Sequence, residues 1–346
     1  MPKKILQKNL KLKKEEKSNQ KRQTDSKNKS SPIPRKVVSL RPKIKLIGIG
    51  GAGCNTISRL KLSFGKGIEI FSLNTDAQVL NKNSFSQKIL IGEKTTNGLG
   101  TGMNWKLGRQ AAEESKEILK EILKGADVVF LTAGLGGGTG TSVAPYLGKL
   151  AKSLNILTIA LVTLPFSFEG ATRRKLANWG LKNLQKNVDA YLAIPNDRIL
   201  KKTIKDTLLE EAFLKIDKIL KETLEGIFEI LSLGGIITLD FTDLEEILKN
   251  SGAVLFVQGR AKGEQRATAA ISRAFQSSLI DFSPKKINSI LLSISGQNIT
   301  LTEVNLIANF IKRVTNKNVK ILFGVLENKN LGKDEIKVNL IASEIE

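Results

Sequence analysis

The sequence predicts an α/β protein with a parallel sheet, a long central helix and a second, smaller α/β domain. Two apolar runs with strand character, Lys43–Gly50 and Asp127–Ala133, each lead through glycines into a segment with helical spacing. Near the middle of the chain, Glu211–Leu231 repeats apolar residues at the spacing of an amphipathic helix. Strand and helix patterns then alternate as far as residue 342. This order favours strands that are joined by helices.

The individual elements follow from the hydrophobic periodicity of the chain. In chain order, the elements that we expect are strand Lys43–Gly50, helix Gly51–Leu60, helix Lys106–Lys124, strand Asp127–Ala133, helix Ser142–Ala151, strand Ile156–Thr163, helix Glu211–Leu231, strand Ala253–Val257, helix Glu264–Leu279, strand Ile287–Ser295, helix Leu301–Val314, strand Val319–Leu326 and strand Ile336–Ala342. The continuous apolar runs of the first half are typical of buried strands.

Composition limits the classes of protein to which the chain can belong. With 346 residues and 41% hydrophobic content, the chain can bury two cores. Its longest apolar run, Ile156–Phe166, is half as long as the ~20 residues of a membrane-spanning helix. The single cysteine excludes an internal disulfide, and the absence of histidine removes the commonest general base and metal ligand. Catalysis must therefore rest on carboxylates, amides, hydroxyls, lysine or arginine, and we assign no residue to a metal.

The positive charge is concentrated in the first 43 residues. Of the net charge of +22, residues 1–43 contribute +12, from fifteen Lys or Arg and three acids, so +10 remains for residues 44–346. Few apolar residues occur there in periodic order, so we predict a disordered extension. It fits a solvated linker, an organelle transit peptide, or a segment attracted non-specifically to anionic lipid or nucleic acid. It contains no aromatic residue, which argues against specific recognition of nucleic acid by base stacking.

The glycine-rich loop Gly134–Ser142 lies between a predicted strand and a predicted helix. Glycines let the backbone approach a ligand closely, and the free N–H groups of the helix start face an anion with the helix dipole behind them. These features are those of a phosphate cradle. A glycine-rich turn without a ligand is the alternative for such a cluster taken alone.

The first glycine-rich segment leaves a second function open. Gly48, Gly50 and Gly53 satisfy the pattern G-x-G-x-x-G. Asp76 follows at about the spacing of the acid that binds a ribose in dinucleotide-binding folds. On this segment alone, a dinucleotide-binding oxidoreductase is an alternative. The signal is weak by itself, and the second glycine loop argues against it.

Several motifs carry a resemblance to a known family. GGGTGT at 136–141 resembles the signature of the tubulin/FtsZ superfamily, and NTDAQ at 74–78 is similar to a loop of FtsZ, a cell- or organelle-division GTPase. No Walker P-loop motif occurs in the chain. The resemblance covers about residues 43–342. It implies a Rossmann-like GTPase domain at 44–210, a central helix at 211–233 and a C-terminal α/β domain at 234–346, with GTP or GDP and Mg²⁺ as cofactors.

The same resemblance implies which residues contact the nucleotide. The two glycine loops would contact the phosphates, a Glu and an Arg the sugar, and three later residues the base. These candidates are Gly51, Ala52, Gly53, Cys54, Asn55, Gly137, Gly138, Thr139, Gly140, Thr141, Glu169, Arg173, Asn196, Phe213 and Asp217. Alternatives stay open for some of them. Glu169 and Arg173 also fit a surface ion pair four residues apart. Cys54 fits a small side chain at a helix start better than a reactive thiol, because the chain has no histidine partner for it.

Asp240 and Asp243 are the candidate catalytic residues. Two carboxylates three residues apart can share one face of a helical turn and orient one water molecule. Acidic residues are also good caps at a helix start, so this spacing alone favours capping. The resemblance to the family's NxDFxD loop favours catalysis. A central helix of ~20 residues spans about 30 Å, so we expect these aspartates to act on the nucleotide of a neighbouring subunit.

Three residues depart from the family's pattern. Ser142 replaces a glycine, Trp105 a proline and Thr238 an asparagine. Serine caps a helix well, so we expect the first change to be tolerated. Proline at a first helical position restricts the unfolded chain, so we expect the loop Gly98–Asn104 to be looser without it. A structural filament subunit that binds GTP and hydrolyses it poorly is therefore an alternative.

Together these observations predict a filament-forming division protein that hydrolyses GTP between the subunits of a head-to-tail homopolymer. We expect it to reach a membrane only through adaptors, although the given chain stops without the linker and short peptide by which many relatives recruit them. GLGTG, IPNDR and LTEVN are most similar to motifs of cyanobacterial and plastid members. A basic extension also suits import. We therefore expect a chloroplast division-ring protein, with the bacterial cytoplasm as the alternative location.

Overall fold

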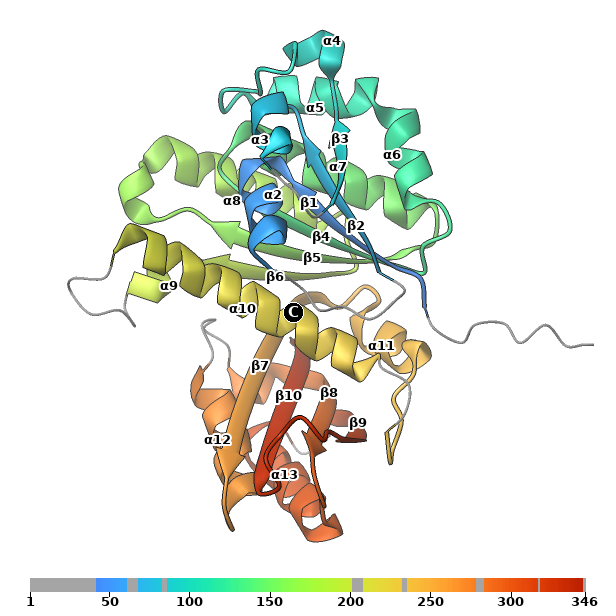
Figure 1. Ribbon diagram of the computed structural model, residues 1–346, viewed down its shortest axis with the longest axis vertical. Coiled ribbons are helices and arrows are strands. Elements are labelled where there is room, and N and C mark those ends of the chain that lie inside the picture. The colour runs from blue at the N-terminus through green and yellow to red at the C-terminus, as the bar shows by residue number, and fades with distance from the viewer. Residues whose placement is uncertain are drawn as a thin grey trace, which may run out of the picture. The chain divides into compact units, whose positions relative to one another are not determined.

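A computed structural model of the chain describes residues 42–60, 68–82, 86–200, 208–231, 235–277, 283–316 and 318–344 (Figure 1). Apart from its last two residues, the predicted extension at 1–43 lies outside these ranges. So do residues 232–234, where we expected the central helix to give way to the C-terminal domain. A ten-stranded sheet runs through the described chain in the order β3-β2-β1-β4-β5-β6-β7-β10-β8-β9.

The first six strands pair parallel, as the sequence predicted. They are β1 (Ile44–Ile49), β2 (Ile68–Asn74), β3 (Gln87–Leu90), β4 (Val128–Gly134), β5 (Leu157–Leu164) and β6 (Ala190–Pro195). Ile49 at the end of β1 lies beside Leu73 of β2 and Ala133 of β4. The loops that follow these strands therefore leave the sheet at one edge, which brings both glycine-rich loops together.

Helices cover both faces of the parallel strands (Figure 1). They are α2 (Gly50–Leu60), α3 (Ala77–Asn81), α4 (Glu93–Thr96), α5 (Trp105–Glu114), α6 (Lys116–Leu123), α7 (Gly138–Ser153), α8 (Ala171–Gln185) and α9 (Asp197–Leu200), with a 3₁₀ turn, η1, at Ser167–Glu169. Successive side chains of β1 point to opposite faces, so Leu46 and Ile47 belong to different cores. All six residues of β1 are buried, which explains its mostly apolar sequence. The exception is Lys45, whose Nζ donates to Ile122 O at 2.7 Å.

The single helix predicted over Lys106–Lys124 is wrong in one detail. The structure has two helices there, and Ser115 between them has φ −93° and ψ 17°. Its hydroxyl accepts a hydrogen bond of 2.9 Å from Gly92 N. The buried side chain thus ties the break to the start of α4, 23 residues earlier. Periodicity continues through the break, so the sequence pattern could not reveal it.

A 22-residue helix, α10 (Leu209–Ile230), connects the parallel strands to the C-terminal half (Figure 1). That half contains α11 (Phe241–Leu248), β7 (Gly252–Lys262), α12 (Arg266–Ser277), η2 (Pro284–Lys286), β8 (Ile287–Gly296), α13 (Leu301–Val314), β9 (Lys320–Glu327) and β10 (Glu335–Glu344). β10 pairs antiparallel with β7 and β8. β7 runs five residues beyond its predicted end at Val257, because its polar end continues to pair with β10. Among the described helices, none is long and apolar enough to cross a membrane.

In the C-terminal half, far along the chain from the glycine loops, an ion pair joins α12 to α13. Arg266 Nε lies 2.6 Å from Glu303 Oε1, and both side chains are nearly buried. The same guanidinium donates to the carbonyl oxygens of Gln297, Asn298 and Lys333. The hydrogen bond between the two side chains raises the pKa of Arg266 and lowers that of Glu303. Glu303 of the LTEVN motif therefore takes part in a structural contact.

Candidate functional site

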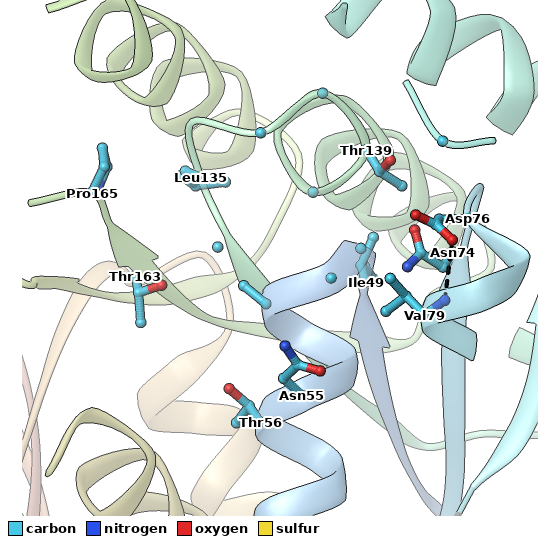
Figure 2. Close-up of a pocket in the computed structure, with 18 of the residues that line it drawn as sticks. Ile49, Asn55, Thr56, Asn74, Asp76, Val79, Leu135, Thr139, Thr163 and Pro165 are labelled. Carbon is cyan, nitrogen blue, oxygen red and sulfur yellow. Dashed lines mark hydrogen bonds between the residues drawn. The ribbon is translucent and has the colours of Figure 1, made fainter. Parts of the chain in front are cut away.

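A cavity of about 730 Å³ opens at the carboxyl edge of the parallel strands (Figure 2). Its walls come from the loops that follow β1, β2, β4, β5 and β6, and from α2 and α10. Figure 2 shows Asn55 and Thr56 on α2, Asn74 at the end of β2, and Thr139 on α7 arranged around this space. The volume is in the range of small-molecule sites.

Close backbone packing requires glycine in the central loop. A Cβ on Gly138 would lie 2.2 Å from Thr101 Oγ1, and a Cβ on Gly140 would lie 2.5 Å from Gly134 O. Gly51, in contrast, lines the cavity where a Cβ would meet nothing within 4 Å. Glycine thus does two things here: it lets the loops pack together, and it leaves open space beside the backbone.

Helix α7 begins within the central glycine loop. The sequence pattern placed its start at Ser142, but the helix starts four residues earlier, at Gly138. Tight packing of the glycines overrides their low helix propensity. Ser142 does not cap the helix, because its hydroxyl donates to Gly138 O at 2.8 Å inside the first turn. The N-cap, Gly137, supplies no side-chain acceptor, so the N–H groups of this turn are free to bind an anion in the cavity.

Three threonines tie the loops of the cavity together. Thr139 Oγ1 lies 2.8 Å from Thr75 Oγ1 and 3.3 Å from Thr101 Oγ1, and all three residues are buried. They come from the loop after β2, the loop between α4 and α5, and α7. The hydroxyls therefore hold three separate parts of the chain in one arrangement.

Two buried amides in the cavity wall lack hydrogen-bond partners. Asn74 Nδ2 and Asn196 Oδ1 are both buried without a partner, and their residues are only 2% and 5% exposed. Buried polar atoms are almost always paired in folded proteins. One amide offers a donor and the other an acceptor. Both residues line the cavity, so these atoms point to a polar ligand.

Phe213 and Asp217, both on α10, form another part of the wall. Asp217 accepts hydrogen bonds from Thr56 Oγ1 at 3.0 Å and from Arg59 Nη1 at 2.9 Å. The Phe213 ring meets the edge of the Phe166 ring, with 5.6 Å between centroids. An aromatic face beside a held carboxylate suits a flat, polar-edged group such as a nucleobase.

Glu169 and Arg173 also line the cavity, and they form an ion pair with each other. Glu169 Oε1 in addition accepts a hydrogen bond of 2.8 Å from Phe166 N. The ion pair that their four-residue spacing predicted is thus present, and a ligand in the cavity would contact it. Sugar binding by these residues stays a prediction.

Comparisons with known proteins agree with this geometry. Residues 43–203 match the family model described as Tubulin/FtsZ family, GTPase domain, and residues 252–346 match FtsZ family, C-terminal domain. A solved structure of an empty FtsZ dimer from M. jannaschii is 36% identical, with a TM-score of 0.80, and the match covers 88% of this chain and 89% of that chain. The chain belongs to the tubulin/FtsZ family.

Two further structures place this tubulin/FtsZ protein among its relatives. A point mutant of M. jannaschii FtsZ is 37% identical with a TM-score of 0.80, over 88% of this chain and 92% of that chain. CetZ2 from Haloferax volcanii, solved as a GTPγS-bound protofilament, is 22% identical with a TM-score of 0.74, over 88% and 93%. The CetZ2 match shows the fold alone. The family's GTPase domain supports GTPase activity and the binding of GTP and GDP.

Most of the predicted nucleotide-binding residues of this tubulin/FtsZ protein lie around the cavity. Twelve of the fifteen line it: Gly51, Ala52, Asn55, Gly137, Gly138, Thr139, Gly140, Glu169, Arg173, Asn196, Phe213 and Asp217. The predicted nucleotide contacts of the GTPase did not include several other residues of the wall, namely Thr56, Arg59, Asn74, Asp76 and Thr101, although the dinucleotide alternative assigned Asp76 to a ribose. The only sequence signal for Arg59 is its position one helical turn after Asn55.

Three of the predicted contacts, Gly53, Cys54 and Thr141, do not line the cavity, and their contact with a nucleotide stays a prediction. Gly53 faces the sheet, where a Cβ would be 2.3 Å from Thr132 O. Cys54, one residue on, is 1% exposed, and burial raises the pKa of its thiol to about 12. Thr141 is fully buried and accepts a hydrogen bond of 2.8 Å from Gly136 N. These residues pack α2 and shape the central loop.

The alternative of a dinucleotide-binding oxidoreductase is not favoured. Both glycine loops belong to the matched GTPase domain. Asp76, the acid that this alternative assigned to a ribose, is the N-cap of α3. Its Oδ1 accepts hydrogen bonds from Gln78 N at 2.9 Å and Val79 N at 3.1 Å, the latter drawn in Figure 2.

Asp240 and Asp243 lie apart from the cavity, at the start of α11. Asp240 Oδ1 accepts from Asp243 N at 3.0 Å, and Asp243 Oδ2 accepts from Asp240 N at 2.8 Å. This reciprocal arrangement is a capping box, so the capping role that their spacing allowed is present. Backbone hydrogen bonds between Ile237 and Val325 of β9 anchor the segment before them. Their catalytic role stays a prediction.

Proposed function

We propose that this protein binds GTP in the cavity, assembles head to tail with copies of itself, and hydrolyses GTP at the contact between subunits. The observation that supports the proposal is that the candidate binding residues and the candidate catalytic residues lie in two different places, the cavity and the start of α11. The cavity holds glycine-lined space and unpaired buried amides. The paired aspartates lie beyond α10, whose 22 residues span about 33 Å.

The charges of the cavity give GTP one orientation. The free N–H groups at the start of α7 attract the phosphates, and Gly51 leaves space for them. Asp217 would repel phosphate, but its carboxylate can accept hydrogen bonds from the N–H groups of guanine. The base would then lie against Phe213, with Asn196 Oδ1 facing one of its donors.

Each carboxylate of the cavity is already engaged by the protein. Asp76 caps α3, Glu169 pairs with Arg173, and Asp217 accepts from Thr56 and Arg59. These contacts give the cavity carboxylates structural roles. We therefore assign the orientation of the attacking water to Asp240 and Asp243 of a second copy, whose capping box uses one oxygen of each carboxylate. The relatives solved as a dimer and as a protofilament support assembly of this kind.

Mg²⁺ fits the oxygen-rich lining of this site. The described residues contain no group of three or more Cys, Asp or Glu side chains that could hold a metal. Thr101 and Thr139 offer hydroxyl oxygens beside the proposed phosphate position, so phosphate and water would complete the shell. When bound, Mg²⁺ would neutralise charge on the terminal phosphates.

The division-ring role rests on the family and on sequence resemblance. We propose contact with a membrane only through adaptors and place the protein in the plastid, with the bacterial cytoplasm as the alternative. Residues 1–43 fused to a fluorescent reporter test the location. Import with removal of the extension supports the plastid, and diffuse cytosolic signal without processing contradicts it.

The decisive test of the function is the rate of GTP hydrolysis against protein concentration. An active site completed by a neighbour gives no turnover below a threshold concentration and a steep rise above it. A line through the origin would show that one subunit is sufficient. Tight GTP binding without turnover at any concentration would favour the poorly hydrolysing filament subunit.

Mixing experiments test the contribution of the second copy. Asp243→Ala should bind GTP and polymerise but hydrolyse little, because its own cavity is intact. When mixed with wild type it should lower activity more than its mole fraction, since each mutant turn faces an intact neighbour's nucleotide. A decrease in simple proportion to the mutant fraction would contradict catalysis in trans.

A further inference from the structure

The chain contains two tryptophans, and the fold brings them into contact. Trp105 is the first residue of α5, and Trp179 lies in α8. Their ring centroids are 4.2 Å apart with 42° between the planes. Both residues are half-buried. Neither lines the cavity.

We propose that Trp105 and Trp179 are positioning residues that hold the loop Gly98–Asn104 against the bound nucleotide. The inference rests on the function proposed above, because it takes the ligand of the cavity to be GTP. It replaces the expectation that the loop is loose without a proline. In this chain, the loop is restrained instead by the contact between Trp105 on α5 and Trp179 on α8.

The loop is held firmly in its first half and less so in its last part. Gly98, Gly100 and Gly102 all have positive φ, and so does Met103. The first half is attached by hydrogen bonds from Ala77 N to Gly98 O at 3.0 Å and from Gly100 N to Thr75 O at 3.1 Å, and by the contact between the Thr101 and Thr139 hydroxyls. The last part is exposed and leads directly into α5. The position of α5 therefore decides where this part of the cavity wall lies.

Two helices flank the first turn of α7, and the tryptophans join them. On α5, a Cβ on Gly108 would lie 2.3 Å from Ser142 Oγ and 3.0 Å from Gly138 O. On α8, a Cβ on Gly180 would lie 2.3 Å from Thr141 Cγ2. Trp179 directly precedes Gly180. Helices α5 and α8 thus both pack against the first turn of α7, and the Trp105–Trp179 contact joins α5 to α8.

The geometry at position 105 allows either proline or tryptophan to restrain the loop Gly98–Asn104. Asn104, the N-cap, is extended with φ −79° and ψ 100°, which a following proline permits. Its side chain accepts from Lys106 N and Leu107 N, so capping does not use the N–H of residue 105. Proline at this first helical position fits the helix. It would restrain the loop through the backbone, whereas tryptophan restrains it through α8.

The test removes the contact from the α8 side, away from the loop. Trp179→Leu keeps an apolar side chain without the aromatic ring, and Trp179→Phe keeps a ring. We expect Trp179→Leu to weaken GTP binding about 3- to 10-fold, the range of an aromatic pair, and to speed amide exchange at residues 98–104. Trp179→Phe should remain close to wild type.

The double variant Trp105→Pro/Trp179→Leu separates positioning from general damage. A backbone restraint at residue 105 should restore slow exchange and GTP affinity, although the ring contact is absent. If Trp179→Leu binds GTP as wild type does and exchanges no faster, the inference is wrong. If the double variant is as weak as Trp179→Leu, it is also wrong, because lost packing then explains the defect.

Amide exchange at residues 98–104, measured without nucleotide, tests the positioning role independently of the proposed function. Wild type that fails to bind GTP would overturn the function of the cavity. Faster exchange at 98–104 in nucleotide-free Trp179→Leu would still show that the pair positions the loop. Equal exchange in both proteins would overturn the positioning role, whatever the cavity binds.

Discussion

The cavity and the turn at Asp240–Asp243 differ in how their polar groups are satisfied. In the cavity, Asn74 Nδ2 and Asn196 Oδ1 are buried without partners, and the first turn of α7 has no side-chain cap. In the turn, each aspartate accepts a hydrogen bond from the other's backbone. The cavity is therefore incomplete without a ligand, whereas the turn is complete as a helix cap.

This difference is consistent with the proposal that hydrolysis requires two copies of the chain. A binding site benefits from unpaired donors and acceptors, because the ligand then supplies their partners. A water-orienting carboxylate benefits from a rigid position, and the capping box provides it. Four predictions test the two regions against each other.

The largest effect is expected from blocking the central glycine loop. In Gly138→Val, the new Cβ would overlap Thr101 Oγ1 at 2.2 Å, so the loop must move. We expect GTP affinity to fall by at least about 100-fold in calorimetry, because the helix N-terminus loses its alignment with the phosphates. Gly51→Ala is the matched control, since its Cβ meets no protein atom within 4 Å. A modest loss there would show that the ligand occupies that space, and unchanged affinity in both variants would place the nucleotide elsewhere.

The next effect separates capping from catalysis in the turn. Asp240→Asn keeps an N-cap oxygen for Asp243 N, and asparagine caps helices about as well as aspartate. Folding stability should therefore hardly change. If the carboxylate orients water, hydrolysis should fall by about 100-fold or more, with GTP affinity unchanged. Wild-type turnover in Asp240→Asn would show that residue 240 is only a cap.

A smaller effect is expected from Asn196, whose unpaired Oδ1 lies in the cavity wall where we propose that the base binds. Asn196→Ala removes Oδ1, which has no partner in the protein. Loss of one ligand hydrogen bond of about 1–2 kcal/mol should weaken GTP binding about 5- to 30-fold. Thermal stability should not fall through lost pairing, because that oxygen bonds to no protein group. Unchanged affinity would show that Asn196 does not face the base.

The smallest effect concerns pH and the residue next to that amide. Burial raises the pKa of Asp197, but hydrogen bonds from the Ser167 N–H and hydroxyl and from Arg174 outweigh it and hold the pKa below its ordinary value of 3.8. The stabilisation is therefore present above about pH 4 and is lost as the pH falls through the lowered pKa. Asp197→Asn should be less stable than wild type at pH 7, by about 0.5 kcal/mol for a half-exposed pair.

Urea unfolding at several pH values provides the measurement. The difference between Asp197→Asn and wild type should shrink below about pH 4, where the wild-type carboxylate becomes protonated. A difference that stays constant as the pH falls well below that value would show that the charge of Asp197 does not contribute.

The sequence by itself identified three of the six strands in the parallel half, β1, β4 and β5, whereas β2, β3 and β6 were not among the predicted elements. Buried parallel strands are continuous apolar runs, and this property is local enough to recognise, as in β1 and β4. The two glycine loops and the capping spacing of Asp240 and Asp243 are also local patterns. Such motifs and the family resemblance supplied fifteen candidate nucleotide contacts, of which twelve line the cavity.

Tertiary structure decided which side of each element faces the cavity. On α2, Asn55 lines the cavity while Gly53 and Cys54 pack against the sheet, although all three lie within one helical turn. The break at Ser115 depends on Gly92, and Trp105 depends on Trp179, 74 positions away. Helical periodicity shows that a helix has a buried side, but the partners of that side are set by contacts between distant segments, and these form only when the chain has folded.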